Sequence, residues 1–258
     1  MFRYLVEEDR WETLSDKPTP VSEVQGALIG ERIFLPGGTL SNGQPTDVLE
    51  VYDPRSDSWE AGTPLPKPIS AYALAAFEGR LYLFGGWDGN KTLSQVYVYD
   101  PGEDAWRPGA PMTAARRDAR AVALTDKIAL SGGQNDQDLF SDTLVYFPSR
   151  DRLGENPWGK LPDLPEPRYS FGLASIYDSL YVIGGETSQR GTIENSGIFL
   201  TRDGWVTLPT NKNYTGRPIE MVSLGSLLVI FDTSSSQQET SLWQYQAFYY
   251  SIYIPYLP

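Results

Sequence analysis

The sequence predicts an all-β fold of the β-propeller class, and two markers with the same period support this. A glycine pair closes a short apolar run four times, at intervals of 48, 47 and 52 residues, at Gly37, Gly85, Gly132 and Gly184. A tryptophan returns at intervals of 48, 47, 52 and 47 residues, at Trp11, Trp59, Trp106, Trp158 and Trp205. Internal periods of about 40 to 50 residues with several short strands per unit are typical of propeller blades.

Each unit divides into four short segments, which we interpret as four strands. In the second unit they are "AYALAAFEG", "RLYLFGG", "QVYVYDP" and "EDAWRPG". The second segment is a nearly continuous apolar run, as expected for a strand buried on both faces. "YDP" is a turn signal, because aspartate caps local backbone and proline ends a ladder. We expect the glycine pair to let the backbone turn and to leave room for the fourth-strand tryptophan, here Trp106.

The ends of the chain depart from this pattern. Phe231 and Asp232 replace the glycine pair in the fifth unit, where we place Trp243 at the tyrosine position and Tyr250 at the tryptophan position. We therefore predict one domain over 1–258, with five recognisable four-stranded blades and an N-terminal half blade. Six-bladed geometry with one incomplete blade is favoured, and a five-bladed ring is the alternative. The predicted units are 1–16 for the half blade and 21–66, 68–113, 117–166, 169–210 and 217–258 for the successive blades.

These residues resemble the kelch repeat. A glycine pair closes the second strand, Tyr52 and Tyr99 each precede a tryptophan by seven residues, and the exit reads "LPEPRYS". The third and fourth units depart from the motif with "LVYFPSRDR" and "GIFLTRDGW". The resemblance implies a kelch-type β-propeller whose first strands line a central channel. It also implies that the loops after the glycine pairs share one face with the loops entering each first strand, and that this face commonly binds partners.

Composition excludes several function classes. The chain contains neither cysteine nor histidine, which removes disulfides, thiol nucleophiles, Ser-His-Asp catalysis and the usual zinc and copper sites. Copper radical oxidases of the kelch type are excluded on the same ground. A net charge of −12 disfavours nucleic acid as a partner. We expect no cofactor, no transmembrane segment and no secretory signal within this sequence. The localisation stays open between the cytoplasm and secretion after signal removal.

Two features of the loop face are candidate binding elements. Trp87 follows a glycine pair directly and precedes Asp88 and Asn90. Its indole could stack on a sugar ring or receive a partner side chain. Packing on a neighbouring loop is the alternative for Trp87. The loop "QNDQDLFSD" is rich in aspartate, but its spacing does not match an EF-hand, so we predict a solvated acidic loop and no metal site.

Arginines at the entries to the first strands are the second signal. Counting fourteen residues back from each glycine position marks equivalent sites at the channel mouth, namely Glu23, Ala71, Asp118, Ser170 and Arg217. Arginine on a concave surface binds carboxylates through bidentate hydrogen bonds, which predicts an acidic peptide or acidic sugar as ligand. The alternative is that these arginines pair with neighbouring carboxylates. The predicted binding residues are Glu23, Trp87, Asp88, Asn90, Arg116, Arg117, Asp118, Asn135, Asp136, Arg168, Ser170, Arg190 and Arg217.

Three functions compete on this fold. We favour a binding module that takes a protein or acidic ligand on the loop face. The second is a sugar-acting enzyme resembling sialic acid mutarotases, with Glu23 or Glu220 as general base opposite Arg117 or Arg217. The third is a structural piece of a larger protein. Kelch adaptors of ubiquitin ligases bind acidic peptides with a ring of arginines, but this chain shows no BTB-like helical region.

Overall fold

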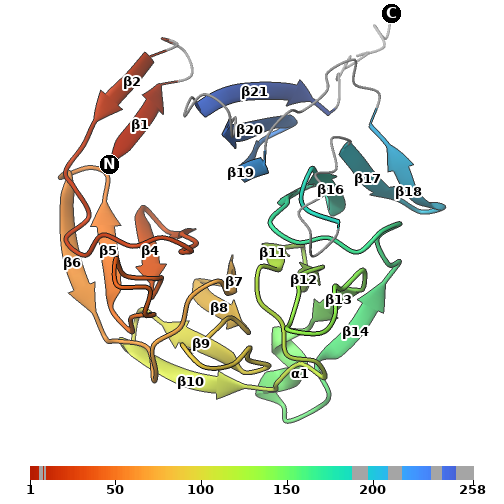
Figure 1. The fold of residues 1–258 in the computed structure, drawn as a ribbon, viewed down its shortest axis with the longest axis horizontal. Helices are drawn as coiled ribbons and strands as arrows, with labels where there is room; N and C mark the ends of the chain where they lie inside the picture. Colours follow the sequence, from red (N-terminus) through yellow and green to blue (C-terminus); the bar gives the residue numbers. More distant parts are fainter. Residues whose placement is uncertain (6–7, 9, 188–196, 209–216, 234–239, 248–258) are drawn as a thin grey trace, which may run out of the picture. The chain divides into compact units, whose positions relative to one another are not determined.

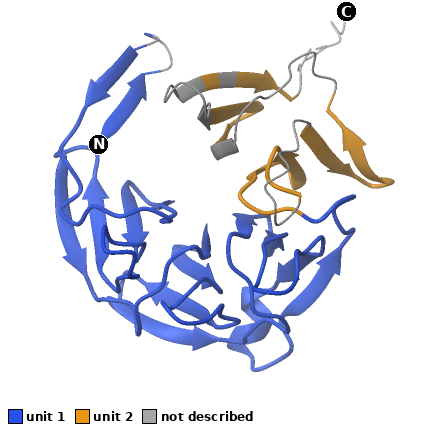
Figure 2. Cartoon of the chain, in the orientation of Figure 1, with its two compact units in different colours: residues 1–167 blue, residues 168–258 orange. Residues whose placement is uncertain are grey.

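The computed structural model describes all residues except 6–7, 9, 188–196, 209–216, 234–239 and 248–258. The described residues are built almost wholly of antiparallel strands, so the predicted all-β fold is confirmed. They hold one helix, α1 (Pro148–Arg152), and none that is long and apolar enough to span a membrane. The chain divides into two compact units, residues 1–167 and 168–258 (Figure 2).

The first unit contains a two-stranded hairpin and three four-stranded antiparallel sheets (Figure 1). The second sheet packs between the other two, because β7 contacts β3 on one side and β11 on the other. The hairpin is β1 (Phe2–Leu5) and β2 (Arg10–Thr13). The sheets are β3 (Ala27–Ile29), β4 (Arg32–Pro36), β5 (Leu49–Asp53) and β6 (Ser58–Gly62); β7 (Ala73–Phe77), β8 (Arg80–Phe84), β9 (Val96–Asp100) and β10 (Ala105–Gly109); and β11 (Arg120–Ala123), β12 (Ile128–Ser131), β13 (Thr143–Tyr146) and β14 (Trp158–Leu161).

The second unit contains one four-stranded sheet and one sheet with three described strands. The fourth strand expected around Tyr250 falls outside the described residues. The first strands of the two sheets, β15 and β19, contact each other. The strands are β15 (Gly172–Ile176), β16 (Ser179–Ile183), β17 (Gly197–Thr201) and β18 (Gly204–Thr207), followed by β19 (Arg217–Leu224), β20 (Leu227–Thr233) and β21 (Thr240–Gln246).

The pairing in the last sheet corrects one sequence assignment. In β8 the second residue, Leu81, lies opposite the motif tyrosine Tyr99. The second residue of β20 is Leu228, and it lies opposite Tyr245, whereas Trp243 lies opposite Ile230. Tyr245 therefore holds the tyrosine position. The turn before β20 pairs Leu224 with Leu227, as the turn before β8 pairs Phe77 with Arg80. Asp232, and not Phe231, therefore matches Gly85, the residue from which the count starts.

The glycine pairs let the backbone turn, as expected from their sequence position, and they also hold neighbouring repeats together. The amide of Gly86 donates to the carbonyl oxygen of Arg116 in the next repeat, at 2.9 Å. A Cβ on Gly85 would lie 2.2 Å from that same oxygen, and Gly85 has a φ of +64°. The three atoms nearest to such a Cβ are this oxygen, Met112 Cε and the Leu93 carbonyl oxygen, and none belongs to Trp106. Glycine is needed here for close backbone approach between repeats.

The tryptophans also join neighbouring repeats. The Trp106 indole packs against the Tyr99 ring in a tilted arrangement, with ring centroids 5.0 Å apart, and donates to the Thr63 carbonyl at the exit of the preceding repeat, at 2.9 Å. Asp104, five residues after Tyr99, accepts from the tyrosine hydroxyl at 2.5 Å and from the Thr63 amide at 2.8 Å. These hydrogen bonds lower the pKa of the Asp104 carboxyl. The same set of a tyrosine, an aspartate and a tryptophan joins the first three four-stranded sheets to the segment before each of them.

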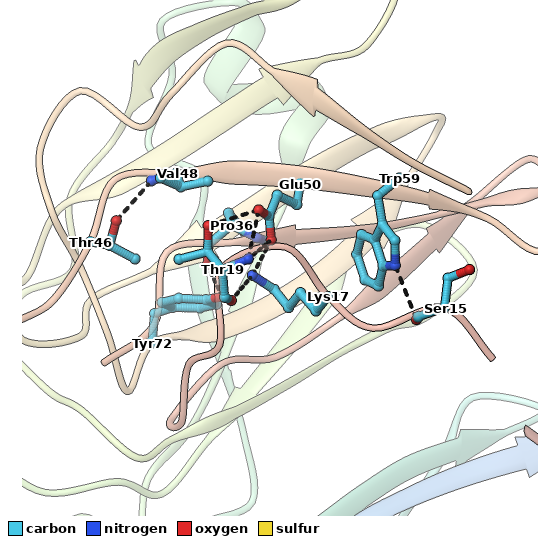
Figure 3. A network of polar contacts seen from close by, with 9 residues as sticks. All are labelled: Ser15, Lys17, Thr19, Pro36, Thr46, Val48, Glu50, Trp59 and Tyr72. Carbon is cyan, nitrogen blue, oxygen red and sulfur yellow. Dashed lines mark hydrogen bonds and ion pairs between the residues drawn. The ribbon is translucent and has the colours of Figure 1, made fainter. Parts of the chain in front are cut away.

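A buried ion pair secures the segment that leads into the first sheet (Figure 3). Glu50 on β5 is only 5% exposed, and its carboxylate pairs with the Lys17 ammonium. It also accepts from the Thr19 amide at 3.0 Å and from the Thr19 hydroxyl at 2.8 Å. A buried carboxylate is tolerated when it is paired and hydrogen-bonded in this way. The network anchors the chain a few residues before Glu23, where the candidate site begins.

Candidate functional site

A repeated backbone arrangement forms the site. In each of four repeats, a residue before the first strand makes an isolated antiparallel bridge with the residue directly after the glycine pair. In the second repeat, Ser70 and Trp87 exchange both backbone hydrogen bonds, at 2.8 and 3.0 Å. Each bridge brings a strand-entry loop against a glycine-pair loop, as the resemblance implied. The bridges are Ser22 with Thr39, Ser70 with Trp87, Arg117 with Gln134, and Tyr169 with Glu186.

The residues that follow these bridges share one unusual conformation. Glu23, Ala71, Asp118 and Ser170 have φ values of +51°, +52°, +55° and +53°. The left-handed region is uncommon for residues other than glycine. In the first unit these positions are also linked, since the amide of Ala71 donates to the Glu23 carbonyl at 3.0 Å and that of Asp118 to the Ala71 carbonyl at 2.8 Å. One backbone frame therefore presents a different side chain in each repeat.

A cavity of ≈ 350 Å³ lies over this frame in the first unit. Its lining combines the left-handed residues of three repeats with the residues after their glycine pairs. Four predicted binding residues meet there: Glu23, Trp87, Arg117 and Asp118. The remaining lining residues are Thr39, Gly43, Ala71 and Gln134. Thr39 and Gln134 were missed, although each follows a glycine pair directly, as Trp87 does.

Both carboxylates of the cavity are held by neighbouring side chains. The Glu23 Oε2 atom accepts from the Thr39 hydroxyl at 2.7 Å and from the Ser70 hydroxyl at 3.4 Å. The Asp118 Oδ2 atom accepts from the Gln134 side-chain amide at 2.9 Å. Burial raises the pKa of the Asp118 carboxyl, and the nearby Glu23 carboxylate adds to the increase, while Gln134 and Arg117 oppose it. The cavity therefore contains two carboxylates in fixed orientations.

Trp87 differs from the tryptophans of the repeat motif. Trp59, Trp106 and Trp158 each donate the indole N–H to a backbone carbonyl of the preceding repeat, at 3.3, 2.9 and 3.2 Å. The partly exposed side chain of Trp87 has no hydrogen bond or ring contact with any described residue. Its backbone bridge positions it on the cavity wall, where its indole N–H has no acceptor among the described residues.

Arg117 is the cavity's cation. Its guanidinium lies 3.8 Å from the Asp118 carboxylate and 3.7 Å from that of Asp136, which is 72% exposed. Both distances exceed that of a direct hydrogen bond.

Two predicted arginines are structural rather than exposed. Arg116 is 1% exposed, and its guanidinium makes two hydrogen bonds to the Asp142 carboxylate, at 2.7 and 3.0 Å, and one to the Gly132 carbonyl. Arg168 is 3% exposed and donates to the Gly184 carbonyl at 3.1 Å. Neither lines the cavity, so we remove both from the candidate site. Arg116 instead follows the alternative given for these arginines, because it pairs with a carboxylate of the protein itself, that of Asp142.

The other predicted residues lie around the cavity or outside the described part. Asp88 and Asn135 shape turns, because their side-chain oxygens accept from backbone amides two and three residues ahead, and Asp88 also pairs with Lys67. Asn90 is exposed on the Asp88 turn. Ser170 belongs to the second unit. Arg190 lies outside the described residues, and Arg217 begins β19 with a side chain that is not described. Within the described part, no group of acidic side chains is suited to hold a metal ion.

Comparison with known proteins agrees with this architecture. A family model for the KLHDC2/KLHL20/DRC7 Kelch-repeats domain matches residues 1–185. The solved structure of YjhT aligns with a TM-score of 0.77 at 15% identity, covering 93% of this chain and 85% of that one, which shows a shared fold.

Three curated relatives match either a short part of the chain or most of it at lower identity. Alpha-scruin of Limulus polyphemus is 32% identical over 90 residues, covering 35% of this chain and 10% of its own length. Kelch repeat and BTB domain-containing protein 13 of Mus musculus is 35% identical over 95 residues, covering 35% of this chain and 20% of its own length. Kelch-like protein terF of Aspergillus terreus is 28% identical over 231 residues, covering 84% of this chain and 50% of its own length. The chain thus spans half or less of these relatives.

The repeated markers, the four-stranded sheets and the family match agree with one another. Since the family model covers well over half of the sequence, this chain belongs to the kelch-repeat family.

Proposed function

We propose that this domain is a binding module whose cavity, lined by Glu23, Trp87 and Asp118, receives a side chain of a partner protein. Trp87 is the observation that carries the proposal. A partly exposed indole on a concave wall, without a side-chain partner among the described residues, is the kind of group that dominates binding energy at interfaces. Membership of the kelch family supports the proposal, because kelch propellers generally bind proteins.

The backbone frame supports the same function. It repeats from blade to blade, while the side chains it presents change from Glu23 to Ala71 to Asp118 and from Thr39 to Trp87 to Gln134. A constant frame with varying side chains suits a recognition surface, since specificity resides in side chains while the fold supplies their positions.

We expect Trp87→Ala to weaken partner binding about 30-fold, since loss of a buried aromatic anchor costs about 2 kcal/mol. The measurement pans a random peptide display library on the wild-type domain and compares the affinities of the selected peptides for the variant. Asn90→Ala is the matched control, because Asn90 is exposed on the same loop and does not line the cavity. Peptides that bind the Trp87→Ala variant as tightly as the wild type would overturn the proposal.

Action on a sugar is a second candidate function, and one observation favours it. The Asp118 carboxylate, whose pKa burial raises, lies 3.8 Å from the Arg117 guanidinium in a cavity that also contains an aromatic ring. A carboxylate of raised pKa in a cavity is a candidate general base, and an indole can stack on a pyranose ring. Asp118 would then accept the anomeric hydroxyl proton, and Arg117 would orient an acidic or hydroxyl substituent.

NMR of anomeric exchange in sialic acid and in neutral sugars tests this second function. An enzyme would raise the exchange rate above that of buffer, and Asp118→Asn would lower the gain about 100-fold, as expected for loss of a general base. Equal rates with and without the wild-type protein for every sugar would rule out this activity on the panel.

A further inference from the structure

We propose that the cavity selects a basic side chain of the partner protein, the guanidinium of arginine or the ammonium of lysine. This inference rests on the binding function proposed above and names the class of side chain that the cavity takes. It reverses the acidic ligand expected from the arginines of the sequence.

The first observation behind this inference is that each carboxylate of the cavity has one oxygen without a hydrogen bond among the described residues. Thr39 and Ser70 engage only Oε2 of Glu23, and Gln134 engages only Oδ2 of Asp118. The second oxygen of each carboxylate, Oε1 of Glu23 and Oδ1 of Asp118, has no hydrogen-bond partner among the described residues. Each carboxylate is thus held in place by one oxygen while the other can accept from a ligand. Donor-rich cations are the natural partners of such oxygens.

The charges around the cavity favour a cation as well. Arg117 is shared between Asp118 and Asp136 at distances beyond direct hydrogen bonding. Arg120, on β11, also acts electrostatically on Asp118, with less influence than the Glu23 carboxylate has. Among the described residues that line the cavity, two carboxylates, those of Glu23 and Asp118, face one guanidinium group, that of Arg117. An acidic ligand would add to the repulsion between Glu23 and Asp118, whereas a basic one relieves it.

Trp87 supplies an observation independent of charge. An indole face attracts a cation placed over it, and Trp is the strongest of the aromatic residues in this interaction. The stems of lysine and arginine are apolar and pack well along an aromatic wall. Ala71 and Gly43, the smallest residues of the lining, leave space beside these groups.

The experiment uses pools of immobilised 12-residue peptides in which the central residue is fixed in turn as Arg, Lys, Gln or Glu and the flanks are randomised. The wild-type domain should be retained at least 10-fold more by the Arg or Lys pools than by the Gln and Glu pools. Because exposed charge pairs are screened by salt, this preference should fall when NaCl is raised to about 1 M.

The carboxylate variants make the test specific to the cavity. Glu23→Gln and Asp118→Asn should each reduce the preference for basic pools at least 5-fold, and Asn readily adopts the left-handed conformation of position 118. Glu103→Gln is the matched control, because it removes one carboxylate from an exposed residue outside the cavity. If Asp118→Asn fails to fold, Glu23→Gln and the salt dependence of the wild type decide the question.

The outcomes separate this inference from the binding function. Retention that depends on Trp87 but favours Gln or Glu pools would overturn the basic ligand and leave the binding module intact. Failure of all pools to show retention that depends on Trp87 would overturn both. Equal loss of preference in Glu103→Gln would show that net charge alone, and not the cavity, selects basic peptides, and would also overturn the inference.

Discussion

Gly85→Ala is expected to destabilise the domain by about 2–5 kcal/mol. The left-handed conformation of Gly85, with φ of +64°, costs about 1–2 kcal/mol with any Cβ present. The new Cβ would also lie 2.2 Å from the carbonyl oxygen of Arg116, so the backbones of two repeats must separate at an added cost of about 1–3 kcal/mol. Urea denaturation followed by tryptophan fluorescence measures the loss.

Gly79→Ala is the control that separates the two contributions. Gly79 also has a positive φ, +73°, but a Cβ placed there meets nothing within 4 Å. Gly79→Ala should therefore lower the free energy of unfolding by the conformational contribution alone, about 1–2 kcal/mol. Equal losses for the two variants would show that contact between the repeats contributes nothing, and would contradict the role assigned here to the glycine pairs.

Arg116→Met is expected to cost about 3 kcal/mol of stability. The guanidinium is 1% exposed, makes two hydrogen bonds to Asp142 and lies 4.2 Å from the centre of the Phe140 ring. Methionine would leave Asp142 without its cation, and breaking a buried pair costs about 3–5 kcal/mol. The lower end applies because the Asp142 side chain is 21% exposed and water reaches it. The same denaturation assay measures the effect.

Two further variants test why Arg116 matters. Arg32→Met removes an exposed ion pair with Glu60, whose side chains are 47% and 57% exposed, and should cost less than about 1 kcal/mol. Arg116→Met combined with Asp142→Leu should recover part of the loss, because no buried charge is then left unpaired. If Arg116→Met instead left stability unchanged and weakened partner binding, Arg116 would return to the candidate site.

The repeat made some of the site residues predictable and left others hidden. Counting from the glycine pairs found Glu23, Ala71 and Asp118, because a repeat places equivalent residues in equivalent conformations. The same count would have found Thr39 and Gln134, which occupy the position of Trp87. Counting could not show that Arg116 is buried while the adjacent Arg117 is partly exposed, because that depends on which side of the chain each side chain faces.

Sequence periodicity alone determined the all-β fold, the four-stranded units and the positions at which the loop face presents its side chains. The tertiary structure decided which of those side chains are available to a ligand. Arg116 and Arg168 are buried, and their guanidinium groups donate to the Gly132 and Gly184 carbonyls and, at Arg116, to the Asp142 carboxylate, while Glu23, Trp87 and Asp118 gather around one cavity. Burial and pairing of side chains arise from contacts between repeats, so they cannot be read from the spacing of residues along the sequence. They are the reason that we propose a basic ligand in place of the acidic one expected from the sequence.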